Sequence, residues 1–342
     1  MKTIYQVAQE AMRVEIDRYL YLADVTDGFN QVQEHHLQDD NTALLFGAGI
    51  DSQIEVKKEN YRLLINDFKR KPAILFDIES AVCVGVYSQI RPYIRKLYAS
   101  AADLTDRFTK FEPVTIKQNP HLLPVFQNIL KYSKSQLKKK VGSVSDNLIS
   151  NPASIKMAKL LSEKALEKEY EESTIIQRME ITLEGIVRDL VGRYLFEDVV
   201  ANALDKHNVK YLREGDYPAL SGVVYDFRAD FLLSDPDNPI AFIEVRKSSS
   251  RHASLYAKDK MFSAINWKGK HKNLIGVIVV EGEWTQATLK TMAYVFDYVV
   301  PLSKINELAQ TLKKAQEGDK SVLKWLIEFK IKPSPLFTSD EA

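Results

Sequence analysis

The stretch that decides the fold is "DFRADFLLSDPDNPIAFIEVRKSSS", which runs from Asp226 to Ser250. Two apolar segments in it carry acidic residues, and the segment "SDPDNP" lies between them. Because Ser, Asp, Pro and Asn favour tight turns, the pattern predicts two strands joined as a β-hairpin. The first strand is expected over residues 222–233 and the second over residues 240–247.

The hairpin would bring acidic side chains together. Residues two apart in a strand share a face, so Asp226, Arg228 and Asp230 should line one face of the first strand. Glu244 and Arg246 should likewise share a face of the second. Asp230 and Glu244 can then lie side by side at one end of the sheet, where two ionised carboxylates repel each other. A Mg²⁺ ion held by one or two carboxylates, waters and phosphate oxygens would remove that repulsion.

A second interpretation treats the same side chains as ordinary surface charges. Oppositely charged residues often pair across neighbouring strands, so Asp230 and Glu244 could be exposed partners of Arg228 and Arg246. However, both carboxylates follow or interrupt apolar segments, "IAFI" and "YDFRADFLL". An ionised carboxylate among apolar neighbours needs a partner. We therefore treat Asp230 and Glu244 as a candidate metal site.

The elements around the hairpin predict an α/β fold. Thr174 and Gln177 fit a capping box at the start of a long helix that continues to residue 207. A weak strand at 209–214 precedes the hairpin. Alternating helices and strands follow it, with helices at 252–267, 285–296 and 304–316 and strands at 273–282 and 297–302. The strand–helix–strand crossovers indicate a mixed sheet flanked by helices.

The first half of the chain has a different texture. Apolar residues recur there at three- and four-residue steps, which predicts amphipathic helices. We therefore expect a mostly helical domain over residues 1–170, used for target recognition or dimerisation, and a second domain over residues 171–342. The lysine-rich segment "KYSKSQLKKK", Lys131–Lys140, is usually a solvated helix face. In a protein that binds nucleic acid it could also track a phosphate backbone.

Composition and charge narrow the class of protein. The chain has 342 residues, 45% hydrophobic content, a net charge of +1 and a single cysteine, Cys83. One cysteine excludes a disulfide framework within the chain and makes a cysteine-based zinc site implausible. No apolar run approaches the roughly 18 residues of a membrane span, and no signal peptide is recognisable. We expect a soluble cytoplasmic protein with no membrane partner.

The acidic pair and its surroundings resemble the PD-(D/E)xK nuclease superfamily, the fold of many type II restriction endonucleases. The resemblance covers residues 174–312 and rests on Asp230 and the segment "EVRK" at 244–247, in the expected order of elements. It implies a restriction endonuclease-like core in which Asp230 and Glu244 bind Mg²⁺. That superfamily often has an assisting glutamate on its first helix. Glu184 matches this position, and Glu180 matches it less well.

The catalytic cation departs from the superfamily pattern. There a Lys two residues after the Glu assists the reaction, whereas here Arg246 holds that position and Lys247 follows it. Strict alternation would turn Lys247 to the opposite face unless a β-bulge at the strand end re-aims it. Arg246 could replace the lysine, Lys247 could reach across a bulge, or Lys258 or Lys260 of the next helix could supply the charge. We favour Lys247.

The resemblance implies a Mg²⁺-dependent, sequence-specific endonuclease that hydrolyses double-stranded DNA and leaves 5′-phosphate and 3′-hydroxyl ends. Cutting both strands with one site per chain implies a homodimer with two-fold symmetry. Two alternatives remain, a DNA repair or recombination nuclease of the same fold and a DNA-binding module that has lost cleavage. The polar residues after the hairpin are candidate DNA contacts: Ser248, Ser249, Arg251, Lys258 and Lys260.

A second segment, "SQIEVKKENY" at 52–61, looks similar at its centre but lacks the same context. The residues before Glu55 are polar and broken by glycine, so no apolar strand precedes it. Asp51 lies too close to belong to a separate strand. We expect Glu55 and Lys57 to lie on a charged surface segment rather than in an active site.

Overall fold

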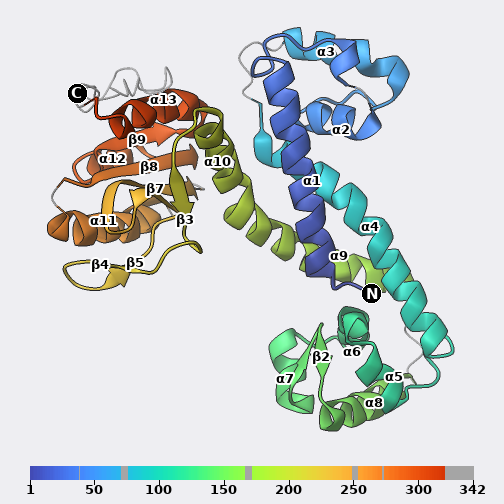
Figure 1. Cartoon of the computed structure of the whole chain (residues 1–342). Helices are drawn as coiled ribbons and strands as arrows, with labels where there is room; N and C mark the ends of the chain where they lie inside the picture. The colour runs from blue at the N-terminus through green and yellow to red at the C-terminus, as the bar shows by residue number, and fades with distance from the viewer. Residues whose placement is uncertain (38, 71–75, 166–171, 249–252, 272, 320–342) are drawn as a thin grey trace, which may run out of the picture. The chain divides into compact units, whose positions relative to one another are not determined.

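The computed structural model describes residues 1–37, 39–70, 76–165, 172–248, 253–271 and 273–319. The chain divides into two compact units, Met1–Leu195 and Phe196–Ala342 (Figure 1). The boundary therefore lies beyond the residue 170 expected from the change in sequence texture. It falls inside the long helical segment, where a π-helical turn, Val191–Leu195, separates α9 (Glu172–Leu190) from α10 (Phe196–Lys206).

The N-terminal unit is helical, as the periodicity of its sequence predicts. A two-stranded hairpin interrupts the helices. Among the described residues of both units, no helix is long and apolar enough to cross a membrane. Besides α9, the elements are α1 (Ile4–Val25), α2 (Asp40–Gly49), α3 (Tyr61–Arg70), α4 (Ile78–Leu104), α5 (Pro113–Gln118), α6 (Leu123–Leu130), α7 (Lys134–Val141), β1 (Val144–Ser145), β2 (Leu148–Ile149) and α8 (Asn151–Ala165).

The two longest helices of this unit, α1 and α4, pack against each other at a glycine. Glu15 of α1 is fully buried, pairs with Arg18 and accepts a hydrogen bond of 2.6 Å from Gln89 of α4. A Cβ at Gly85 would lie 2.3 Å from the Glu15 carboxylate. Gly85 is therefore required for the close approach that lets α4 accommodate a buried charge.

The C-terminal unit contains a five-stranded mixed sheet in the order β3-β6-β7-β8-β9. The strands are β3 (Tyr211–Arg213), β6 (Phe231–Asp235), β7 (Asn238–Ser248), β8 (Ile275–Gly282) and β9 (Tyr298–Pro301). The β3–β6 and β6–β7 pairs are antiparallel, and the β7–β8 and β8–β9 pairs are parallel. The predicted hairpin and mixed sheet are thus present.

Helices cover both faces of the sheet (Figure 1). Helices α10 and α13 (Ile305–Gln316) pack together on one face, and α11 (Ala253–Lys270) and α12 (Gln286–Met292) on the other. On the α11 face, Leu232 and Phe242 are opposite each other in the register and pack with Trp267. Residues two apart in a strand point to the same face, and Glu244 and Arg246 lie two and four residues after Phe242. The side chains of Glu244 and Arg246 are therefore also directed to the α11 face.

The first strand of the hairpin is shorter than predicted. Residues 222–233 do not form one strand, because β5 (Asp226–Phe227) pairs with β4 (Leu220–Ser221) in a separate two-stranded sheet. Strand β6 begins only at Phe231. Asp226, Arg228 and Asp230 therefore do not line one strand face, and only Asp230 reaches the sheet.

Candidate functional site

Asp230 sits at the entrance to β6, where backbone contacts hold it. Its Oδ2 accepts a hydrogen bond of 2.7 Å from the Val245 amide, and its carbonyl accepts one of 3.1 Å from the Glu214 amide. The preceding residue, Ala229, is anchored by the buried hydroxyl of Tyr217, which donates to its carbonyl at 2.9 Å and accepts from its amide at 2.8 Å. Local contacts therefore position the Asp230 carboxylate against β7.

Glu244 lies in the middle of the sheet and is fully buried, while Asp230 is 8% exposed. One guanidinium reaches both carboxylates, since Arg246 Nη1 is 3.5 Å from Asp230 Oδ2 and Arg246 Nη2 is 3.4 Å from Glu244 Oε2. Lys260 of α11 adds a second cation, with its Nζ 2.7 Å from Glu244 Oε2. The two acids predicted from the sequence are thus brought together in a buried cluster of charges. The alternative interpretation is wrong in expecting them to be exposed, although the pairing with Arg246 that it expected is present.

Burial and mutual repulsion perturb the carboxyl groups of this cluster. Loss of hydration is the largest cause that raises the pKa of Glu244 to about 8; the charge on Asp230 acts in the same direction, and Lys260 and Arg246 oppose it. Glu197, in the first turn of α10, has its pKa raised to about 7 by burial and then by Asp230. Near neutral pH both groups can therefore hold or release a proton.

The raised pKa of Glu244 predicts a pH-dependent stability. A carboxyl whose pKa is higher in the folded than in the unfolded chain binds more protons when folded, so it lowers the free energy of unfolding as pH rises between the two values. For Glu244 this window extends from its ordinary value of 4.5 to about 8. Glu244→Gln should remove this dependence. As pH rises through the window, the free energy of unfolding of the variant should therefore increase relative to that of the wild type, by at most roughly 1.4 kcal/mol per pH unit.

Urea unfolding at pH 5, 6.5 and 8 in EDTA measures this difference, and Glu214→Gln, which changes an exposed glutamate of the same unit, is the control. If wild type and Glu244→Gln keep the same stability difference at all three pH values, Glu244 titrates normally. Added Mg²⁺ should stabilise the wild type more at pH 8 than at pH 5, because metal ligands must be deprotonated.

The chemistry of the site fits a hard divalent cation. Both Glu244 oxygens are buried, and no described residue gives them a hydrogen bond of suitable geometry, although Lys260 is close enough to form an ion pair. Within the described ranges, no group of three or more His, Cys, Asp or Glu residues is arranged to hold a metal. Mg²⁺ needs only one or two carboxylates, since waters and phosphate oxygens complete its shell. Asp230 and Glu244 are the residues that would supply them.

The structure directs Lys247 to the face of the sheet opposite Glu244 and Arg246. Its strand keeps an unbroken register with β8 from Ala241 to Ser248, so no bulge re-aims the side chain. Lys247 Nζ lies 5.6 Å from the ring centre of Phe196, on the α10 side of the sheet. The expectation that Lys247 reaches the carboxylates is therefore corrected, because strand alternation persists to the end of β7. Arg246 and Lys260, two of the other possibilities, are the cations beside Glu244.

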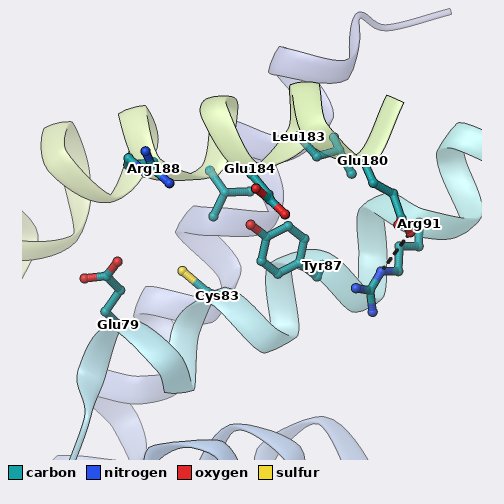
Figure 2. A pocket seen from close by; sticks show the side chains of 9 residues that line it. Glu79, Cys83, Tyr87, Arg91, Glu180, Leu183, Glu184 and Arg188 are labelled. Atoms are coloured by element: carbon teal, nitrogen blue, oxygen red, sulfur yellow. Dashed lines mark ion pairs between the residues drawn. The ribbon is translucent and has the colours of Figure 1, made fainter. Parts of the chain in front are cut away.

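Glu184 and Glu180 belong to α9 in the N-terminal unit. With residues of α4 they line an open pocket of about 320 Å³ (Figure 2). There Glu180 forms an ion pair of 3.5 Å with Arg91. Burial is the main cause that raises the pKa of Tyr87, and the charge of Glu184 acts in the same direction. The helix that begins the C-terminal unit is α10, and its acidic residue coupled to Asp230 is Glu197.

The sequence interpretation overlooked Glu197 because it treated residues 174–207 as one helix. The π turn divides this helix, and the segment "LFEDVV" then opens α10. A signal was present, since Glu197 lies between Phe196 and Val199, both of which are buried. A glutamate on the apolar side of a helix that precedes the first strand is a stronger candidate than one farther upstream.

The candidate DNA contacts fall in different environments. Ser248 ends β7 and is buried, and its carbonyl accepts a hydrogen bond of 2.8 Å from the Glu283 amide, so its side chain is not exposed for a DNA contact. Lys258 is exposed on α11, whereas Lys260 is buried in the cluster. Ser249 and Arg251 lie outside the described residues.

The similar segment at 52–61 is a charged surface, as predicted. Glu55 and Lys57 are exposed and form an ion pair of 2.9 Å outside any strand. The buried acidic cluster of the C-terminal unit is therefore the stronger functional candidate.

Comparisons with family models, curated proteins and solved structures give no match to this chain.

Proposed function

We propose that the C-terminal unit is a Mg²⁺-dependent endonuclease that hydrolyses phosphodiester bonds of double-stranded DNA, similar to a type II restriction endonuclease. One observation carries this proposal: Asp230 and Glu244, from neighbouring strands, lie buried against one guanidinium, with the Nζ of Lys260 2.7 Å from Glu244 Oε2. Arg246 and Lys260 offset part of the repulsion between the two carboxylates, and a divalent cation between them would offset the rest.

The surrounding side chains have roles that suit hydrolysis. Asp230 and Glu244 would hold Mg²⁺, which supplies charge stabilisation at the scissile phosphate and acidifies a bound water. Lys260 and Arg246 would hold the phosphate and stabilise the charge that develops on it. Glu197 has its pKa raised to about 7, near the pH at which a general base works best, and would accept the proton of the attacking water.

The proposal extends to the assembly and the place of action. One acidic cluster per chain cuts one strand at a time, so cleavage of both strands is proposed to use a homodimer whose two-fold axis matches that of duplex DNA. Because DNA is the proposed substrate, we also propose that the enzyme acts in the cytoplasm. Light scattering of the purified chain, with and without a DNA duplex, measures whether the active species contains two copies.

A substrate panel tests the function. The wild-type chain is incubated with plasmid, single-stranded and branched DNA in Mg²⁺, and the ends of the products are mapped by sequencing. We expect discrete plasmid fragments with 5′-phosphate ends, and no cleavage in EDTA. Preferential cutting of branched or damaged DNA would instead assign the chain to repair or recombination. Cleavage that is unaffected by EDTA would contradict the proposed metal dependence.

One feature favours a second candidate, a DNA-binding module without cleavage. The position two residues after Glu244 holds Arg246, and its guanidinium lies against both carboxylates. Arginine stays protonated in proteins, so it cannot act as a general base toward the attacking water. Duplex binding without cleavage across Mg²⁺, Mn²⁺ and Ca²⁺ would support this candidate. Mn²⁺- or Mg²⁺-dependent cutting would exclude it.

A further inference from the structure

A strongly basic surface lies in the N-terminal unit, far along the chain from the acidic cluster. Helix α7 has eight residues, four of which are lysines, and all four are exposed. We call this set the α7 lysine surface: Lys134, Lys138, Lys139 and Lys140. No acidic residue occurs between Lys131 and Val141.

The charges of the α7 lysine surface are weakly compensated. Lys134 lies 3.8 Å from Asp146 of the β1–β2 hairpin. Among the described residues, Lys138, Lys139 and Lys140 form no ion pair, and the Nζ of Lys140 lies 5.1 Å from the ring centre of Tyr132. Leu137 and Val141 are the buried residues of the helix. The helix therefore docks on its unit through a narrow apolar side and presents its charges to solvent.

This arrangement is costly for a helix of two turns. Lys134 and Lys138 are four residues apart, where like charges destabilise a helix by about 0.2–0.5 kcal/mol. The last-turn lysines interact favourably with the helix dipole, which offsets part of this cost. Ser133 compensates in part through a capping box with Gln136. A polyanion on this surface would relieve the remaining repulsion.

Helices α6 and α7 are consecutive and are joined by three residues, the length of the turn in a helix–turn–helix. Helix α6 ends at Leu130, residues 131–133 turn the chain, and α7 begins at Lys134. Lys131 caps α6 in the left-handed conformation, with φ of 56°. Helices α6 and α7 both pack against α8. In helix–turn–helix proteins the second helix lies in the major groove of DNA.

From the exposed lysines and this geometry, we propose that α7 is a docking helix for double-stranded DNA. The proposal rests on the proposed function in taking DNA as the partner, but binding is measured without cleavage. Lysine side chains mainly contact phosphates, which carry no sequence information. The side chain best suited to read a base, Gln136, is engaged in the capping box. The α7 lysine surface should therefore supply affinity for any duplex rather than sequence specificity.

The test compares two charge reversals in the full chain. Lys138→Glu/Lys139→Glu changes the proposed surface, and Lys69→Glu/Arg70→Glu changes the net charge equally on α3, where both residues are also exposed. Fluorescence anisotropy in EDTA measures the affinity for several duplexes of roughly 30 base pairs between about 50 and 300 mM salt. Each lost phosphate contact removes about 0.9 from the slope of log K against log salt, so two should lower affinity roughly 50-fold at about 0.1 M salt.

We expect this loss for the α7 variant on every duplex, together with a salt slope smaller by about 2. The α3 variant should bind as the wild type does, and circular dichroism checks that both variants fold. Equal affinity of all three proteins, or equal losses in both variants, would overturn the proposal, and so would tighter binding of single-stranded RNA than of duplex DNA. Retained duplex binding in a chain that cleaves nothing would contradict only the proposed nuclease function.

Discussion

Glu244→Gln should lower the rate of DNA cleavage about a thousand-fold while the protein stays folded. Loss of a metal-binding carboxylate removes several kcal/mol of transition-state stabilisation, and each 1.4 kcal/mol is about a factor of ten in rate. Gln keeps the shape of the protonated carboxyl, which the raised pKa of Glu244, about 8, already favours below that pH. Single-turnover cleavage of a plasmid in Mg²⁺ at about pH 7.5 measures the effect.

Asp230→Asn should have a similar effect, because its carboxylate belongs to the same pair. Asp226→Asn is the matched control, since Asp226 is exposed on β5 and lies outside the cluster. Melting temperatures and duplex affinity in EDTA separate loss of chemistry from loss of fold or binding. Should Glu244→Gln and Asp230→Asn cleave as fast as the wild type, the acidic cluster is not the active site.

The second large effect concerns the cation. Lys260→Met should lower cleavage about 100-fold, the scale of losing one preorganised donor to a developing charge. Lys247→Met should change the rate by less than about two-fold, because Lys247 lies over Phe196 on the opposite face of β7. Each variant removes one lysine of the same unit and inserts the same apolar side chain, but Lys260 is buried and Lys247 is exposed.

Lys260 is buried beside Glu244, so removing its charge also affects stability. Lys260→Arg is therefore needed as a third variant, since it restores the charge and should recover part of the cleavage rate. A Lys260→Met chain that cuts normally would leave Arg246 as the working cation. A Lys247→Met chain that loses cleavage, with an unchanged melting temperature, would contradict the assignment of sides.

Much of the local structure could be predicted from sequence, because it depends on short-range chemistry. The turn-forming residues between two apolar segments specify the hairpin, and Asp235↔Asn238 is the last pair of its register. Runs such as "IGVIVV" specify β8, which is buried through most of its length. Asp230 directly precedes Phe231 and Glu244 directly follows Ile243, and because Phe231 pairs with Ile243 the same register brings the two acids together.

The long-range members of the cluster depended on tertiary structure. Lys260 and Glu197 come from helices on either side of the hairpin in sequence. The sequence offers Lys260 only as one of several possible cations, and the apolar neighbours of Glu197 do not show that it is coupled to Asp230. The π turn at Val191–Leu195 and the break before β6 are likewise irregularities without a clear local pattern. Local residue types determined the strands and the two acids, whereas the packing of α10 and α11 decided which charges surround them. That packing depends on contacts between distant segments, which a sequence pattern does not encode.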